Sequence, residues 1–233
     1  MARFLDIKNL HGWYGESHVL HGVNLHVDEG EVVTLLGRNG AGRTSTLRAI
    51  MGLIGRREGS ITVHGQETVA MATHRIARLG LGYCPEERGI FSSLSCEENL
   101  LLPPQLAPGG MSVEQIYAMF PNLAERAQSQ GTRLSGGEQQ MLAVARILRT
   151  GARLLLLDEI SEGLAPVIVQ KLAEMVTTLR RQGYTIVMVE QNFRFAAPLA
   201  DRFLVMEHGE VIQEFSQAEL PARLDRLHEY LGV

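Results

Sequence analysis

The residues with the clearest chemical potential in this 233-residue chain form the stretch GRNGAGRT at positions 37–44. It follows the phosphate-binding loop pattern G-x-x-x-x-G-K-[ST], except that Arg43 stands where lysine is expected. Its glycines leave backbone N–H groups uncovered, so that several of them can donate to one triphosphate. We expect Thr44 to offer its hydroxyl to Mg²⁺. A plain glycine-rich turn is the alternative, and a dinucleotide fold is disfavoured because the spacing G-x-G-x-x-G is not kept.

Two elements must hold this loop in place. Val32, Val33, Leu35 and Leu36 form a continuous apolar run, as in a strand buried on both faces within a parallel sheet. A helix is expected to begin near Thr44. The free N–H groups and the positive dipole end of its first turn favour a bound phosphate.

Carboxylates follow two further predicted strands. Asp158 and Glu159 come directly after the apolar run at 154–157, and Glu86 follows a shorter strand that stops at Pro85. Open α/β sheets bind ligands at this carboxyl edge. There Asp158 can hold Mg²⁺, directly or through water, and Glu159 can orient or deprotonate an attacking water. Taken alone, Glu86 would be interpreted as a solvated loop acid, and Asp-Glu after an apolar run is weak support.

Two other segments could complete a nucleotide site. Residues 135–137, Ser-Gly-Gly, precede a helix with a buried stripe that starts at Met141. They are either a second anion-binding helix end or only a cap. Tyr14, between Trp13 and Gly15, could stack on a purine base or be an ordinary hairpin aromatic.

Composition excludes several classes of protein. Hydrophobic residues make up 45% and charged residues 21% of the chain, as in ordinary globular proteins. The net charge of −4 supplies no basic field, so a nucleic-acid partner is disfavoured. Cys84 and Cys96 fit a reducing cytoplasm, and the eight histidines show no metal-ligand spacing. There is no signal-peptide core and no stretch of ~18 apolar residues, so we expect a soluble chain whose membrane role comes through a partner.

The overall pattern predicts an α/β fold. Its parts are a phosphate-loop NTPase core with a mostly parallel sheet, an N-terminal antiparallel β-subdomain at 4–9 and 19–27, and a helical insertion. The insertion at about 97–134 carries the chain-breaking Pro103, Pro104 and Pro108, a Ser112–Gln115 capping box and no strand signal, within a single domain covering 1–233. Further strands are expected at 59–65 and 184–189, a hairpin at 203–215, and helices at 72–79, 166–183 and 216–233.

In this order the pieces resemble the ATP-binding cassette ATPases over essentially the whole chain. The stretch LSGGEQQ at 134–140 is similar to the signature motif of that family, which other phosphate-loop enzymes lack. The stretches at 84–91, 161–166 and 189–192 resemble one branch, the ATPase subunits of branched-chain amino acid importers. Urea and amide importers are the nearest alternatives.

The resemblance implies an ATPase that works as a head-to-tail pair of cassettes, either a homodimer or a heterodimer. Each ATP, with Mg²⁺, would lie between the loop of one subunit and the signature motif of the other. Membrane permease subunits would be partners and a solute-binding protein an indirect one. The chain would then sit in the cytoplasm, on the inner face of the cell membrane.

The resemblance also assigns roles by position. Tyr14 matches the aromatic that stacks on adenine and Glu159 the carboxylate that activates water, while Glu86 and Gln191 stand at further catalytic positions. Thr44, Asp158 and Glu86 match Mg²⁺ positions. The implied nucleotide-binding residues are Tyr14, Gly37, Arg38, Asn39, Gly40, Ala41, Gly42, Arg43, Thr44 and Ser45, with Ser135, Gly136 and Gly137 supplied by the second subunit.

Four positions depart from the usual cassette pattern. Glu86, Gln191 and Ala165 stand where many cassettes have glutamine, histidine and aspartate, and all three resemble the importer branch. Arg43 keeps the positive charge of lysine but is larger and planar. It leaves open a second function, a regulatory or scaffold subunit that binds nucleotide and hydrolyses little. A soluble cassette protein of repair or translation is disfavoured because such proteins commonly carry two cassettes in one chain.

Overall fold

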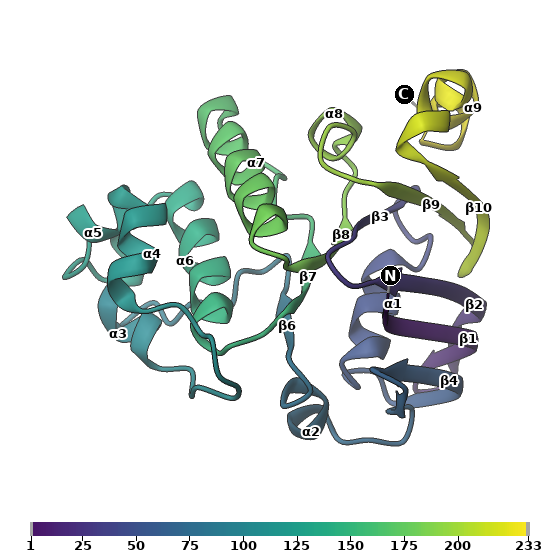
Figure 1. Cartoon of the computed structure of the whole chain (residues 1–233), viewed down its shortest axis with the longest axis horizontal. Helices are drawn as coiled ribbons and strands as arrows, with labels where there is room; N and C mark the ends of the chain where they lie inside the picture. The colour runs from purple at the N-terminus through teal and green to yellow at the C-terminus, as the bar shows by residue number, and fades with distance from the viewer. Residues whose placement is uncertain (1, 232–233) are drawn as a thin grey trace.

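A six-stranded mixed sheet forms the centre of the computed structural model, which describes residues 2–231 (Figure 1). The strand order is β10-β9-β3-β8-β7-β6, in which β10 pairs antiparallel with β9 and the other neighbours are parallel. The strands are β3 (Val32–Leu36), β6 (Leu81–Cys84), β7 (Leu154–Asp158), β8 (Thr185–Val189), β9 (Arg202–Glu207) and β10 (Glu210–Ser216). The predicted mostly parallel sheet is confirmed.

The central strands are mostly apolar because their two faces pack into two different hydrophobic cores. In β7, Leu155 and Leu157 belong to a cluster with the helices α6 (Gly136–Arg149) and α7 (Pro166–Arg181). Leu154 and Leu156 point the other way, into a cluster shared with α1 (Arg43–Ile50) and the N-terminal strands. Successive side chains of a strand alternate between its faces, so a sheet covered on both sides needs no polar position.

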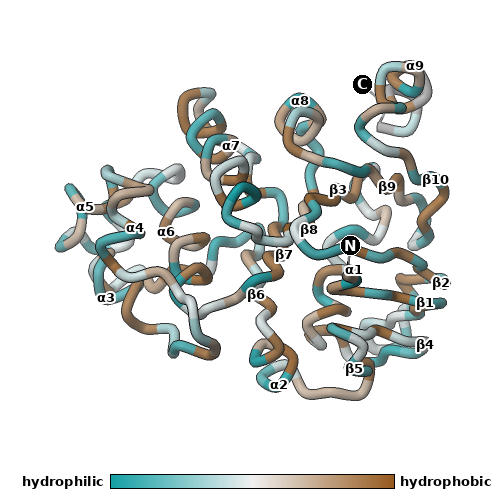
Figure 2. Tube along the Cα trace, in the orientation of Figure 1, coloured by the Kyte–Doolittle hydropathy of each residue, from teal (hydrophilic) through white to brown (hydrophobic). Residues whose placement is uncertain are grey.

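A four-stranded antiparallel sheet lies beside this centre, in the order β2-β1-β4-β5. Its strands are β1 (Arg3–Tyr14), β2 (Ser17–Asp28), β4 (Arg56–Val63) and β5 (Gln66–Glu67). One face is solvated, and β1 and β2 therefore change between hydrophobic and hydrophilic residues along their length (Figure 2). The strands are longer than the sequence pattern predicted. Trp13 and Tyr14 belong to β1, which leaves only Gly15 and Glu16 in the turn.

The helices confirm the predicted helical segments with shorter bounds, although residues 232–233 of the predicted helix at 216–233 lie outside the described residues. Residues 72–79 contain only α2 (Thr73–Ala77), and the predicted helix at 166–183 is α7. The elements not yet given are α3 (Cys96–Leu101), α4 (Val113–Met119), α5 (Pro121–Glu125), η1 (Gly131–Arg133), α8 (Phe193–Ala196), η2 (Gln217–Glu219) and α9 (Leu220–Leu231). Within residues 2–231 the helices are too short or too polar to span a bilayer.

The predicted insertion corresponds to α3, α4, α5 and η1, which lie on the far side of α6 from the antiparallel sheet (Figure 1). The predicted capping box of α4 is confirmed, since Ser112 and Gln115 cap each other's backbone N–H. The segments that enter and leave the insertion are joined to each other. Gly131 N donates to Leu94 O at 2.9 Å, and Ser95 forms an antiparallel bridge with Gln130. That the whole chain is one domain stays a prediction.

Candidate active site

The phosphate-type loop runs from the end of β3 to the start of α1. Gly37 cannot carry a side chain, because a Cβ there would lie 2.4 Å from the carbonyl oxygen of Met206 in β9. Gly42 caps α1 with a φ of 101°, which a residue with a side chain rarely adopts. The neighbouring strand and the left-handed cap therefore fix the glycine positions that the sequence pattern singled out.

A cavity of about 440 Å³ lies over this loop. Residues from the loop, from three strand ends and from the start of α1 line it. They are Val19, Asn39, Gly40, Ala41, Gly42, Arg43, Thr44, Ser45, Glu86, Glu159, Glu162 and Gln191. Most of the residues that the sequence predicted for one nucleotide site thus meet in one place. Arg38 instead lines a smaller neighbouring cavity together with Met206 and His208.

Thr44 and Asp158 are in direct contact below the cavity. Thr44 Oγ1 donates to Asp158 Oδ1 at 2.9 Å, and the Tyr83 hydroxyl donates to Asp158 Oδ2 at 2.9 Å. Burial raises the pKa of Asp158, against the effect of these two hydrogen bonds. Two oxygens bound side by side to an octahedral Mg²⁺ lie about 2.9 Å apart, so this pair fits the ion. Tyr83 was not predicted as a site residue; its place in the strand before Pro85 was the available signal.

Arg43 and Glu159 form a buried ion pair, with Arg43 Nη2 at 2.9 Å from Glu159 Oε1. Their side chains are 4% and 8% exposed. Gln191 Nε2 donates to both oxygens of Glu159 at 3.1 Å, so the predicted catalytic carboxylate is held from two sides. Among the described residues, Arg43 Nη1 is buried and lacks a hydrogen-bond partner. An unpaired buried donor beside a phosphate-type loop fits an anionic ligand.

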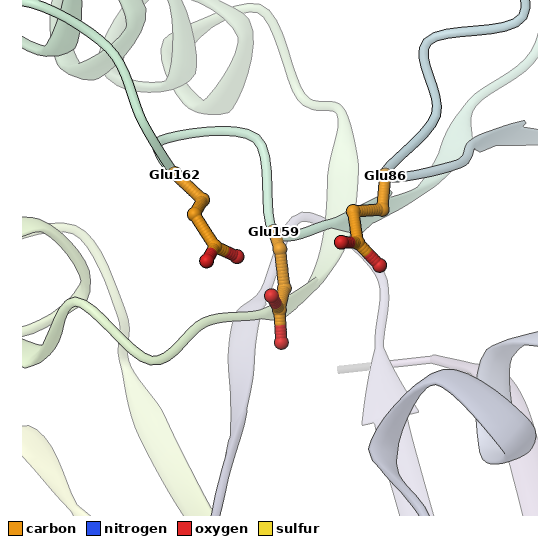
Figure 3. Close-up of side chains that lie close together, drawn as sticks. All are labelled: Glu86, Glu159 and Glu162. Atoms are coloured by element: carbon orange, nitrogen blue, oxygen red, sulfur yellow. The ribbon is translucent and has the colours of Figure 1, made fainter. Parts of the chain in front are cut away.

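Glu162 joins Glu86 and Glu159 in a cluster of three carboxylates, which face one another in Figure 3. One oxygen from each lies within 4.8 Å of the others. A hydrogen bond with Glu159, burial, and the charges of Glu159 and Glu86 raise the pKa of Glu162 to about 7. Burial alone would raise the pKa of Glu159, but hydrogen bonds from Glu162 and Gln191 and the charge of Arg43 lower it. Sequence reasoning missed Glu162, because its side chain reaches the cluster only through the backbone turn that follows Glu159.

Glu190 lies buried beneath this cluster, directly after β8. The Ser161 hydroxyl donates to Glu190 Oε2 at 2.7 Å and the Ser161 N–H to Oε1 at 3.2 Å. Burial raises the pKa of Glu190 to about 7, although these hydrogen bonds oppose the change. Glu190 therefore ties the loop after Glu159 to the sheet and does not face the cavity over the phosphate-type loop.

The predicted second anion site is a capped helix end. The Ser135 hydroxyl accepts from Glu138 N at 3.3 Å, and Glu138 accepts from Ser135 N at 2.7 Å. Gly137 packs so closely on α7 that a Cβ would lie 2.8 Å from the side chain of Ile168. Residues 135–137 are outside the set that lines the 440 Å³ cavity. A single chain thus does not bring the two anion-binding ends together.

Tyr14 lies at the hairpin end of β1, 38% exposed and outside the set of cavity-lining residues. Val19, from the start of β2, is the N-terminal residue that lines the cavity. The hydroxyl of Tyr83 and, with a smaller effect, that of Tyr14 raise the pKa of the Arg48 guanidinium on α1. The stacking role of Tyr14 stays a prediction, as do the catalytic, nucleotide-binding and Mg²⁺ roles of the other site residues.

Known proteins are similar to this chain in sequence and fold. The profile of the family described as "ABC transporter" matches residues 20–162. The high-affinity branched-chain amino acid transport ATP-binding protein BraG of Pseudomonas aeruginosa is 39% identical, over 98% of this chain and 99% of its own. The lipopolysaccharide export system ATP-binding protein LptB of Escherichia coli K12 is 32% identical, over 98% and 97%.

Two solved structures extend the comparison. A nucleotide-free ATP-binding cassette from an ABC transporter has a TM-score of 0.85 at 20% identity, covering 99% of both chains. A dimeric ATP-binding cassette in a post-hydrolysis state, bound to ADP and Pi, has a TM-score of 0.81 at 25% identity, covering 91% of this chain and 98% of its own.

Proposed function

This chain belongs to the ABC transporter family as an ATP-binding, ATP-hydrolysing subunit, and we propose that it drives the uptake of branched-chain amino acids through a membrane permease. The observation that carries the proposal is the 39% identity to BraG, which spans nearly the full length of both chains. LptB, at 32% identity over a similar span, supports export of lipopolysaccharide as the second candidate. Because the identity to LptB is lower than the identity to BraG, import is the first candidate.

In the proposed site the triphosphate lies over the loop at 37–45. Backbone N–H groups of the loop and the first turn of α1 bind its oxygens, and Arg43 supplies the fixed cation. Thr44 and Asp158 would hold Mg²⁺, which would neutralise charge on the phosphates. Glu159 accepts a proton from the attacking water, while Gln191 keeps the carboxylate in place through its two hydrogen bonds.

A second cassette completes the site in this proposal. Residues 135–137 form the N-terminal end of α6, and they lie outside the set that lines the chain's own cavity. A head-to-tail partner, identical or similar, would bring its Ser135, Gly136 and Gly137 over the γ-phosphate. The dimeric cassette bound to ADP and Pi supports this arrangement at the level of the fold.

Partners and location follow from the same proposal. Permease subunits hold the dimer on the inner face of the cell membrane, and a solute-binding protein delivers the amino acid from the other side. The net charge of −4 gives no reason to add a nucleic-acid partner.

The test is transport by the assembled complex. The chain is co-purified with its permease subunits, reconstituted into proteoliposomes, and supplied with ATP and the solute-binding protein. We expect ATP-dependent uptake of leucine, isoleucine or valine, and none with Glu159→Gln. ATPase activity that responds to lipopolysaccharide and not to these amino acids would replace import with export. Stimulation by urea or an amide would keep import and change the substrate.

A further inference from the structure

Three of the eight histidines gather with the single tryptophan on the solvated face of the antiparallel sheet. His11 and Trp13 come from β1, and His18 and His21 come from β2. The sequence spacing gave no sign of this group, because its members meet across the hairpin. His11 lies opposite His21, and Trp13 lies opposite His18, in the strand register.

The group is arranged around two ring nitrogens. His11 Nδ1 and His18 Nε2 share a hydrogen bond at 3.1 Å, in which the tautomers decide which ring donates, and a bound metal ion would replace the shared proton. The His18 ring stacks on Trp13, with ring centroids 4.3 Å apart and an angle of 9° between the planes. The centroid of the His21 ring lies 4.0 Å from that of His18. Stacking on the indole fixes the orientation of the exposed His18 ring, so the two nitrogens are held toward one another without a buried framework.

Charged side chains of β4 also lie near this group. A neutral imidazole is the form that binds metals. Glu58 of β4 lies opposite His11 in the register and contributes a nearby negative charge, although it also pairs with Arg56, which covers the Trp13 ring.

We propose that His11 Nδ1 and His18 Nε2 form a surface site for a divalent transition-metal ion, of which Cu²⁺, Ni²⁺ and Zn²⁺ are the fitting members. Nitrogens bound at about 2.0–2.1 Å lie about 3.3 Å apart on a tetrahedral ion and about 2.9 Å apart in adjacent positions of a square-planar one. The observed 3.1 Å falls between these values. Imidazole selects these metals, whereas Mg²⁺ prefers the oxygens of Thr44 and Asp158.

The ion would join β1 to β2 close to the turn at Gly15 and Glu16. That turn directly follows Tyr14, so a metal here would stiffen the hairpin that carries the proposed adenine-stacking residue. The metal site itself does not depend on any transported substrate, and its test needs no nucleotide.

The test uses the full chain without an affinity tag. Trp13 is the only tryptophan, so Cu²⁺ bound at His18 should quench nearly all tryptophan fluorescence in a saturable way that EDTA reverses. The electron paramagnetic resonance spectrum of the Cu²⁺ complex should show coupling to nitrogen. Zn²⁺ affinity, measured by calorimetry, should fall at least about tenfold in His18→Ala and in His11→Ala.

His74→Ala is the matched control, because His74 is an exposed histidine on α2, away from the sheet. Its Zn²⁺ affinity should equal that of the parent. The acidic cluster at Glu86, Glu159 and Glu162 is intact in all these variants, so any metal it binds does not change between them. Parent-like Zn²⁺ affinity in both His11→Ala and His18→Ala, or oxygen-only coordination in the Cu²⁺ spectrum, would overturn the site.

Discussion

Arg43 Nη2 lies 2.9 Å from Glu159 Oε1, so the cation of the phosphate-type loop is paired with the carboxylate proposed to activate water. Both side chains are buried, and removing one partner from such a pair leaves an uncompensated charge. A phosphate that enters the loop must compete with Glu159 for Arg43. We therefore expect ATP binding to free the carboxylate for its proposed role, because the guanidinium would turn to the phosphate oxygens.

Arg43→Ala should abolish ATP turnover, since the loop then lacks its fixed cation. Arg43→Lys should leave turnover similar or raise it, because lysine supplies a point charge at the position where most phosphate loops have one. Steady-state ATPase rates of the three chains, measured with saturating ATP, decide the point. Should the alanine variant hydrolyse ATP as fast as the parent, Arg43 carries no catalytic charge.

Glu159→Gln should keep ATP binding and slow hydrolysis by about 10²-fold or more, because the amide cannot accept a proton. The slow variant should then accumulate as a dimer in the presence of ATP. Size-exclusion chromatography with and without ATP gives the readout. If the variant elutes as a monomer with ATP, alone and with a partner cassette, the shared-site proposal is wrong.

Tyr14→Ala should weaken ATP binding by roughly 1–3 kcal/mol if the ring stacks on adenine. Tyr14 lies outside the cavity-lining set, so stacking requires the base to extend beyond this cavity or the ring to turn toward the loop. Titration with ATP and with inorganic triphosphate separates base stacking from phosphate binding. Equal losses for both ligands, or an unchanged dissociation constant for ATP, would remove Tyr14 from the base site.

Ser135→Ala should cost about 1 kcal/mol of stability, as the loss of a helix cap does, and should also reduce ATPase activity. Ser112→Ala is the matched control, because Ser112 makes the same capping box at α4. Thermal unfolding should shift by similar amounts in the two variants, while only Ser135→Ala should lose ATP-dependent dimer. Equal ATPase activity of the two variants would mean that Ser135 acts only as a helix cap.

Glu190→Gln should flatten the dependence of stability on pH between about 4.5 and 7. Burial raises the pKa of Glu190 in the folded chain to about 7 from its ordinary value of 4.5. Its contribution to stability is fully present below pH 4.5 and is lost as the pH rises through about 7, because the folded chain must then bury a charge. Urea unfolding at several pH values compares the parent with the variant. Parallel curves would contradict the raised pKa.

Much of the fold could be predicted from the sequence because local patterns fixed it. The apolar runs of β3 and β7, the glycines of the loop and the Ser112 capping box each correspond to one element of the structure. The phosphate-type loop, Glu86, Glu159 and Gln191 meet as expected, since all of them lie in loops at the carboxyl edge of the sheet or at the start of the helix that follows it.

What the sequence could not predict depends on contacts between distant segments. Glu162 and Val19 enter the cavity only through the turn after Glu159 and the packing of β2 on the loop. The pairing of Arg43 with Glu159 joins residues 116 positions apart. The meeting of His11 and His18 depends on the register of a hairpin whose strands were predicted too short.

The bridge between Ser95 and Gln130 and the hydrogen bond from Gly131 to Leu94 join the two segments that connect the insertion to the core, so these segments should move together. The outgoing segment starts beside Glu86, which lines the chain's own cavity, and the returning segment ends at Ser135, which we propose contacts the partner's ATP. A rotation of the insertion relative to the core would therefore displace Glu86 and Ser135 together. In the proposed head-to-tail pair, such a rotation would change the geometry of two ATP sites together, the chain's own and its partner's.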